Sequence, residues 1–362
     1  MYPDAAADDE ASKVPVAPLA ELQPFDQPDR ILEWQSAESG VLSDAYFTDD
    51  FWYASGLESG MIEVEPKAFG LNFRDVMVAL GQVEEDGLVY SEMCGVVKTL
   101  GPDTEMSGLQ VGDRVCGAGW GYVTNLVRTA WGDVAKIPDN LSFEETASVP
   151  TIYITVYHSL VNIARLQRGE TALIHAGTGG VGQAAIMLAQ HIGATIYVTC
   201  SSIEKRNFLI ERYNIDPTHT FSSRVSTFAS AIMTATNGKG VDVLLNCLAG
   251  PLLAAGWECM ARFGRFIEIG KVDMQNGRAL EMSTFGRRVT ISGVDITSLA
   301  AYSKEVYRST LQTTLKLISE GAVKTVYPLH VYSVSEMEKP LRQLQGGKHI
   351  GNLSWQQDRE DW

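Results

Sequence analysis

A glycine-rich turn at residues 177–182 constrains this 362-residue chain more than any other feature of its sequence. Gly177, Gly179 and Gly182 form the pattern G-x-G-x-x-G, directly after a strand-like run and directly before a helical one. The first glycine allows a tight turn, the second lets a pyrophosphate approach the backbone, and the third lets helix and strand pack closely. We therefore predict that a dinucleotide binds the whole loop and the helix N-terminus, through Gly177, Thr178, Gly179, Gly180, Val181 and Gly182.

The sequence around this loop alternates between strand-like and helix-like segments. Strands are expected at 171–176, 195–200, 241–247, 265–270 and 289–294, and helices at 180–191, 204–213, 225–236 and 252–262. Strands rich in Val, Ile and Leu that are separated by amphipathic helices predict a parallel sheet covered on both faces. The fold class is therefore α/β, with the doubly wound parallel sheet of the Rossmann arrangement.

The rest of the chain predicts a second, mainly β domain. Short strands broken by Gly, Asp and Pro run from residue 33 to about 126, and a mostly apolar helix with a kink near Pro150 follows at 147–160. A helix at 304–319 and strands at 324–328 and 330–332 are expected to return and complete this domain. The predicted organisation is an acidic linker (1–29), a substrate domain (30–150, completed by 303–355), a cofactor domain (151–302) and a tail (356–362).

Charge and hydropathy exclude several classes of partner. The formal net charge of −15 leaves no basic excess for the phosphates of nucleic acid. No run approaches the roughly 18 apolar residues that span a bilayer. The first residues also lack the basic and apolar regions of a secretory signal. The expectation is a cytoplasmic protein that binds neither nucleic acid nor membrane.

The residues after the second predicted strand bear on the choice of cofactor. An NAD site usually places a carboxylate there, whereas this chain has the hydroxyls of Ser201 and Ser202 and then the cations of Lys205 and Arg206. Hydroxyl donors and cations suit a 2′-phosphate, so NADPH is the predicted cofactor. The alternative is that Lys205 and Arg206 form a solvated helix face.

Histidines and cysteines do not form a metal site in the sequence. The six histidines and five cysteines include no C-x-x-C pair and no set at the ligand spacing of zinc. No metal is therefore predicted. A reductase without such a Lewis acid suits substrates that accept hydride at a conjugated carbon, because the charge then spreads onto a carbonyl oxygen.

Seven motifs lie in order along the chain, at 70–77, 92–97, 147–150, 177–182, 238–248, 264–271 and 347–351. Together they resemble the enoyl reductase domains of polyketide and animal-type fatty acid synthases. The chain is most similar to fungal highly reducing polyketide synthases, in the zinc-free branch of the medium-chain dehydrogenase/reductase superfamily. The resemblance implies a discontinuous, GroES-like substrate domain beside the Rossmann sheet.

The same resemblance implies an activity and its partners. The expected reaction is NADPH-dependent reduction of trans-2-enoyl thioesters on an acyl carrier protein, with hydride added to the β carbon and a proton to the α carbon. The partners would be that carrier and neighbouring synthase domains. Two alternatives stay open: a free-standing quinone or enone reductase, and a catalytically silent scaffold domain. Monomer and dimer are both possible states.

The resemblance also assigns roles to individual residues. Lys271, after Glu-Ile-Gly, and Asp295 are the expected proton donors, although a solvated lysine and a capping aspartate are ordinary alternatives. The implied cofactor contacts are Asn72, Asn246, Leu248, Gly270 and Lys348.

The chain departs from the family pattern at two positions that bear on these roles. Val83 stands where some bacterial relatives have a proton-donating tyrosine, which leaves Lys271, Asp295 or water as the donor. Asn352 stands where a second lysine is more usual, a change that could weaken the binding of cofactor phosphate or have no effect.

Overall fold

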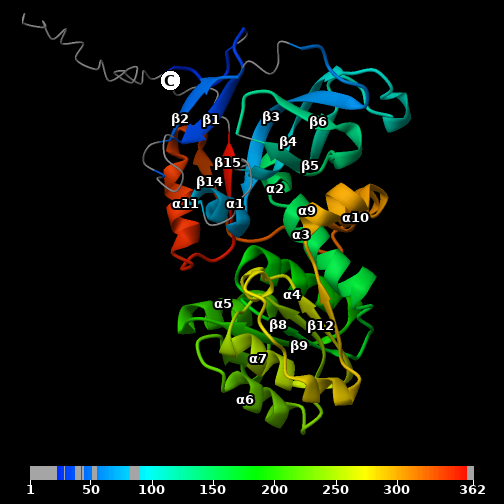
Figure 1. Ribbon diagram of the computed structural model, residues 1–362, viewed down its shortest axis with the longest axis vertical. Coiled ribbons are helices and arrows are strands. Elements are labelled where there is room, and N and C mark those ends of the chain that lie inside the picture. The colour runs from blue at the N-terminus through cyan, green and yellow to red at the C-terminus, as the bar shows by residue number, and fades with distance from the viewer. Residues whose placement is uncertain are drawn as a thin grey trace, which may run out of the picture.

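The computed structural model describes residues 23–27, 29–36, 42, 45–50, 55–81, 90–121 and 123–356. Most of the predicted acidic linker lies outside the described residues, as do Val83 and, apart from Gln356, the predicted tail. Two large sheets lie one above the other, with helices between them (Figure 1).

The lower sheet is parallel and has six strands (Figure 1). Its order is β10 (Thr220–Ser222), β9 (Thr195–Cys200), β8 (Thr171–Ile174), β11 (Val241–Asn246), β12 (Met260–Glu268) and β13 (Thr290–Gly293). The described helices that connect these strands are α4 (Gly180–Ile192), α5 (Ile203–Tyr213), α6 (Phe228–Ala235), α7 (Pro251–Glu258) and the short α8 (Val272–Gln275). The strand order reverses between β8 and β11, which is where doubly wound sheets bind their ligands.

Both faces of the parallel sheet are buried, as its apolar strands predict. Ala172 and Ile174 of β8 pack into one hydrophobic cluster, while Leu173 between them packs into another on the opposite face. Successive strand residues point to opposite faces, so a strand covered on both sides is apolar throughout. The predicted α/β fold class is confirmed.

The upper sheet is mainly antiparallel and combines distant parts of the chain. Its strands are β14 (Leu329–Ser333), β15 (Asn352–Gln356), β3 (Met61–Leu71), β4 (Tyr90–Leu100), β5 (Arg114–Gly121) and β7 (Val134–Lys136), in that order, with β6 (Val127–Ala130) also paired to β3. A separate hairpin joins β1 (Leu32–Ser36) to β2 (Ala45–Asp49). Trp355 of β15 is fully buried among residues of β3 and β4, so the C-terminal strand belongs to the core of this sheet.

Short helices connect the two sheets. Ser142 caps α2 (Phe143–Ala147) in a capping box with Glu145, and α3 (Pro150–Tyr157) begins at a proline, where the missing N–H costs nothing. A π-helical turn (His158–Ile163) continues α3. After β13 follow α9 (Ile296–Tyr302) and α10 (Lys304–Ser319). The upper sheet also carries α1 (Phe73–Ala79) and α11 (Glu338–Gln345).

Candidate cofactor and active site

Two of the three motif glycines are required by packing. Gly177 donates its N–H to the carbonyl of Thr199 at 3.0 Å, and a Cβ on Gly177 would collide with the side chain of Val198. A Cβ on Gly182 would collide with the backbone of Ala176 and Gly177. Side chains at these positions would push the loop away from β9 or α4 away from the loop.

Gly179 differs, because the space beside it is open. The nearest atom to an added Cβ there is the Ala176 carbonyl oxygen at 3.6 Å. Gly180 and Val181 begin the 13-residue helix α4, whose N-terminus therefore opens beside Gly179. Open backbone at the start of a helix fits the pyrophosphate of a dinucleotide.

The predicted hydroxyls and cations follow β9 directly, but the two cations, Lys205 and Arg206, have different environments. Ser202 caps α5 by accepting the Lys205 N–H at 3.2 Å. Nζ of Lys205 donates to the Gly347 carbonyl at 3.0 Å, next to the exposed Lys348. Ser201, the residue before the cap, is partly exposed.

Arg206 is held on the other side of α5. Its Nε donates to Oγ1 of Thr220 at 2.6 Å, and its Nη2 donates to the Pro217 carbonyl at 2.8 Å. Arg224 is the cation that acts on Lys205: burial lowers the pKa of Lys205, and the positive charge of Arg224 lowers it further.

The C-terminal motif reaches the glycine loop from the upper sheet. The N–H of Gly351 donates to the Thr178 carbonyl at 3.0 Å, and Gly179 and Gly351 form a parallel bridge. This contact places Lys348 and Asn352 near the loop, although they lie about 170 residues further along the chain. Asn352 is buried and carries a neutral amide.

A buried carboxyl anchors the end of β11. Asn246 is fully buried, and its Nδ2 donates to Oε2 of Glu268 at 2.6 Å and to the Leu248 carbonyl at 2.8 Å. Oε1 of Glu268 accepts the N–H of Gly270 at 2.6 Å. Burial raises the pKa of Glu268 to about 7, against the lowering effect of these bonds. Glu268 therefore fixes Asn246, Leu248 and Gly270 as one unit.

The two predicted proton donors form an ion pair. Nζ of Lys271, after β12, lies 3.1 Å from Oδ2 of Asp295, after β13, and each side chain keeps about a third of its surface exposed. Burial alone would raise the pKa of Asp295, but hydrogen bonds from Thr297 and the charge of Lys271 bring it below its usual value. Asp295 also caps α9 through the Thr297 N–H at 3.0 Å, so the capping role and the ion pair coexist.

Asn72 approaches the same region from the upper sheet. Its Nδ2 donates to Oε1 of Glu92 at 2.6 Å, and its backbone N–H donates to Oδ2 of Asp75 at 2.7 Å. The charge of Asp295 acts on Arg74, two residues further along, whose pKa burial lowers. The start of α1 therefore lies near the Lys271–Asp295 pair.

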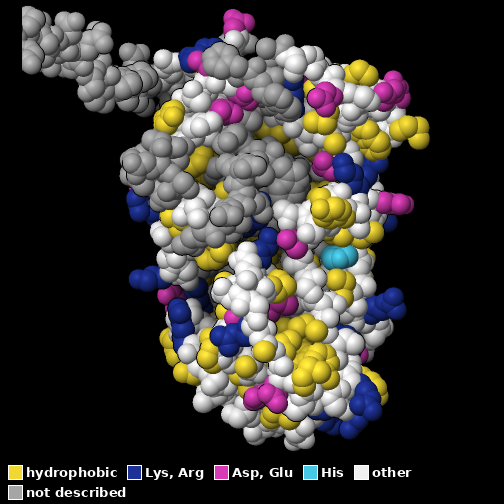
Figure 2. All heavy atoms as spheres, viewed as in Figure 1, with side chains coloured by type: hydrophobic (Ala, Val, Ile, Leu, Met, Phe, Trp, Pro, Cys, Tyr) yellow, Lys and Arg dark blue, Asp and Glu magenta, His cyan; other side chains and the backbone are white. Residues whose placement is uncertain are grey.

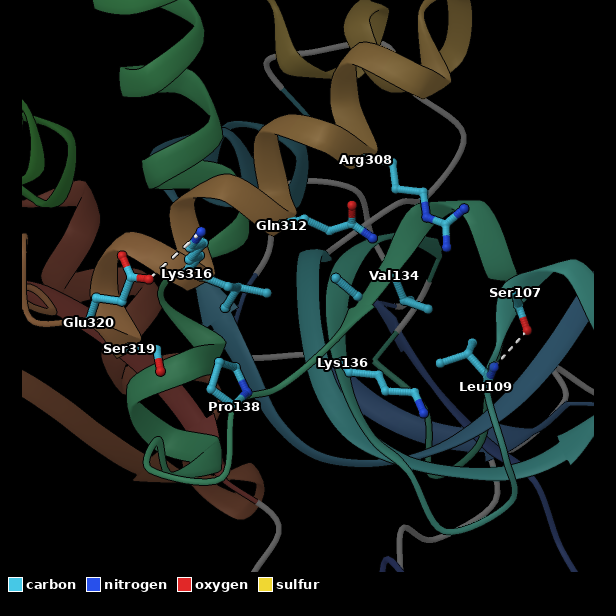
Figure 3. Close-up of a pocket in the computed structure, with 12 residues that line it drawn as sticks. Ser107, Leu109, Val134, Lys136, Pro138, Arg308, Gln312, Lys316, Ser319 and Glu320 are labelled. Atoms are coloured by element: carbon cyan, nitrogen blue, oxygen red, sulfur yellow. Dashed lines mark hydrogen bonds and ion pairs between the residues drawn. The ribbon is translucent and has the colours of Figure 1, made fainter.

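A separate pocket of about 490 Å³ lies between α10 and β7. Figure 3 shows Arg308, Gln312 and Lys316 of α10 on one side and Val134 and Lys136 on the other. None of the predicted site residues lines it. The candidate site is therefore the region between the glycine loop, Lys271 and Asn72, and not this pocket.

Other features of the described residues bear on metal binding, on membrane-spanning helices and on the side chains at the surface. Among them, no group of three or more His, Cys, Asp or Glu side chains is placed to hold a metal ion. Within the same ranges, no helix is long and apolar enough to cross a bilayer. On the face shown in Figure 2, acidic and basic side chains are interspersed, and apolar side chains gather over the parallel-sheet half.

Comparison with known proteins gives one consistent family. The zinc-binding dehydrogenase family matches residues 180–320. The squalestatin tetraketide synthase of Phoma sp. (strain C2932) is 46% identical over 336 residues, which is 92% of this chain and 13% of that protein. The solved CurK enoyl reductase is 30% identical, with a TM-score of 0.80, and the match covers 91% of this chain and 99% of that one.

This chain belongs to the polyketide enoyl reductases. The CurF ER cyclopropanase of the curacin A pathway has the same fold, with 29% identity, a TM-score of 0.80 and coverage of 90% and 99% of the two chains. Polyketide enoyl reductases are medium-chain dehydrogenases/reductases, a superfamily that binds a nicotinamide cofactor. The chain spans about an eighth of the length of its curated synthase relatives.

Three residues of this enoyl reductase site escaped the sequence analysis. Glu92 and Glu268 carry carboxyl groups at buried strand positions. A charged residue within an otherwise apolar strand pattern is unusual, and that is the signal that could have marked them. Arg224 follows the three-residue strand β10, which is too short for periodicity to reveal.

Proposed function

We propose that this chain reduces trans-2-enoyl thioesters carried by an acyl carrier protein, with NADPH as the reductant. The observation that carries the proposal is the Lys271–Asp295 ion pair at 3.1 Å, which follows β12 and β13 at the carboxyl end of the parallel sheet. Ligands of open α/β sheets bind at that end. A charged, partly exposed lysine there has a proton to give.

The described residues fit the two ends of such a cofactor. Open backbone at Gly179 and the α4 N-terminus would hold the pyrophosphate, with Thr178, Gly180 and Val181 around it. Ser201, Ser202 and Lys205, with Arg224 and Lys348 nearby, would hold the 2′-phosphate. Asn246, Leu248 and Gly270 would line the nicotinamide side.

The chemistry divides between the cofactor and the protein. When bound, the reduced nicotinamide supplies the hydride that saturates the β carbon of the enoyl thioester. The electron pair of the double bond then lies on the α carbon and the thioester oxygen as an enolate. Lys271 donates a proton to the α carbon, and water returns one to Lys271. Asp295 orients Lys271 through the ion pair.

The proposed partners follow from the synthase relatives. The chain matches an eighth of those proteins, which leaves most of their length for other domains. We assign the acyl carrier protein and neighbouring synthase domains as partners. A carrier in the same polypeptide needs little intrinsic affinity, because tethering raises its effective concentration.

The test is oxidation of NADPH by the purified chain with a crotonyl pantetheine thioester, followed at the nicotinamide absorbance band. The proposal expects NADPH to be consumed much faster than NADH. Reduction of free quinones but not of the thioester would favour the quinone reductase alternative. Failure to bind NADPH in a titration would favour the silent scaffold.

A further inference from the structure

Glu92 of β4 has a fully buried carboxyl group that joins three elements. Its Oε1 accepts Nδ2–H of Asn72, before α1, at 2.6 Å, and its Oε2 accepts the backbone N–H of Thr151, in the first turn of α3, at 2.7 Å. Both oxygens therefore accept hydrogen bonds from other elements.

The surrounding backbone makes room for this carboxyl. A Cβ on Gly70 of β3 would collide with the Glu92 carboxyl group and with the Ala147 carbonyl, so only glycine fits beside it. Burial raises the pKa of Glu92 to about 8, and the charge of Asp75 adds to that effect, while the bonds from Thr151 and Asn72 oppose it. A buried carboxyl is costly in a core, where an apolar side chain would be more stable.

Asn72 is restrained at two points. Asp75, which is also fully buried, accepts its backbone N–H, while Glu92 accepts its side-chain N–H. Both oxygens of Glu92 accept hydrogen bonds, and the Asn72 group that faces Glu92 is Nδ2, which can only donate. Asn72 as a whole remains partly exposed, so a bound molecule can reach it.

The lower sheet contains the same arrangement. Glu268 accepts Nδ2–H of Asn246 with one oxygen and a backbone N–H with the other, as Glu92 does. Each half of the molecule thus holds one asparagine amide against one buried glutamate.

We infer that Glu92 is a positioning residue, which holds Nδ2 of Asn72 and so fixes the orientation of the Asn72 amide beside the nicotinamide and thioester. The inference rests on the proposed function, because it assumes that those groups bind beside Asn72. It gives Glu92 no contact with the reacting atoms.

The test is a double-mutant cycle with Glu92→Gln and Asn72→Ala. A glutamine has one acceptor oxygen, so its amide group faces one of the two N–H donors and the orientation of Asn72 is lost. We expect kcat with crotonyl pantetheine to fall about tenfold or more in each single variant, and no further in the double variant. The dissociation constant of NADPH should stay within about twofold of the wild-type value, because its phosphates bind elsewhere. Glu63→Gln on β3 is the matched control, since Glu63 pairs with Arg128 outside this network.

A second measurement separates the positioning role from a merely structural one. In the nuclear magnetic resonance spectrum of the unliganded protein, the Asn72 side-chain amide should be protected from hydrogen exchange and lose that protection in Glu92→Gln. Glu92→Asp, which keeps the carboxyl group but is too short to reach both donors, should do the same. This readout needs no turnover, so it stands even if the thioester proves to be the wrong substrate. Losses that multiply in the double variant, or an Asn72 amide unchanged in both Glu92 variants, would overturn the inference.

Discussion

Lys271 and Asp295 come from consecutive strands of one sheet, and their pairing has a direct chemical use. The ion pair holds the Lys271 ammonium group in one orientation after β12. In the mechanism that we propose, the exposure of about a third of each side chain lets water return a proton to Lys271.

Replacing Lys271 by alanine should separate proton delivery from cofactor binding. We expect kcat for crotonyl pantetheine to fall about 100-fold or more, because general acid catalysis contributes at least that much. The dissociation constant of NADPH, measured by fluorescence titration, should change little. Lys239→Ala, at an exposed loop lysine, is the control. Equal turnover in Lys271→Ala and Lys239→Ala would rule out Lys271 as the donor.

Lys205 and Arg206 are adjacent in sequence, but we expect different effects when each is replaced by alanine. Lys205→Ala should weaken NADPH binding about tenfold and leave NADH binding unchanged, because it removes a charge from the 2′-phosphate. Arg206→Ala should instead lower the melting temperature, because it removes the bonds to Pro217 and Thr220. Titrations with both cofactors and a thermal scan check these expectations. A larger loss of NADPH affinity in Arg206→Ala would contradict them.

Residues whose role depends on local geometry could be predicted from sequence. The glycine loop lies between a strand and a helix, and Lys271 and Asp295 follow strand ends that hydrophobic patterns locate. The partners of Glu92 and Arg224 could not be predicted, because they lie on other strands and helices. Arg206 shows the limit of a charge pattern: the sequence gives its charge, but its hydrogen bonds depend on where β10 lies.

At the scale of elements, hydrophobic periodicity predicted the bounds of helices and strands correctly where tertiary packing favours the same structure. The predicted helix at 304–319 matches α10, and the predicted kink near Pro150 is where α3 begins. The predicted helix at 252–262 was wrong at its end, because Met260 pairs with Val241 and so begins β12. The predicted strand at 324–328 was also wrong: β14 begins at Leu329, directly after Pro328, a residue with no N–H for a ladder.

The loop between β8 and α4 should respond differently to alanine at its second and third glycines. Gly182→Ala should destabilise the fold by about 1–3 kcal/mol, because its Cβ collides with backbone that cannot rotate away. Gly179→Ala should keep the melting temperature close to that of the wild type but weaken NADPH binding, because its Cβ occupies space left for the pyrophosphate. Thermal unfolding and cofactor titration check the pair. Equal losses of stability in both variants would contradict the assignment of Gly179 to the cofactor.

At the scale of the whole molecule, two buried glutamates make stability depend on pH. Burial raises the pKa of Glu92 to about 8 and of Glu268 to about 7. In the unfolded chain both have the ordinary pKa of a glutamate, well below 6. At these two residues the folded state therefore holds more protons than the unfolded state between pH 6 and 9, and their contribution to stability falls as pH rises.

Urea unfolding at pH 6 and at pH 9 measures this dependence. The free energy of unfolding should be lower at pH 9, and the difference should shrink in Glu92→Gln, which cannot ionise. Asp295, whose pKa is below its usual value, gives no slope in this range because it is ionised in both states. A free energy that is constant from pH 6 to 9 would show that both glutamates ionise normally.

The position of β15 between β14 and β3 has a consequence for how the molecule is made on the ribosome. All six strands of the parallel sheet are synthesised as one uninterrupted stretch, so that half can complete its pairing during translation. The upper sheet begins with β3 and gains its central partner only when β15 leaves the exit tunnel. Until then the edge of β3 that pairs with β15 has no partner there, although the parallel sheet can already be complete. The upper sheet is therefore started first and completed last.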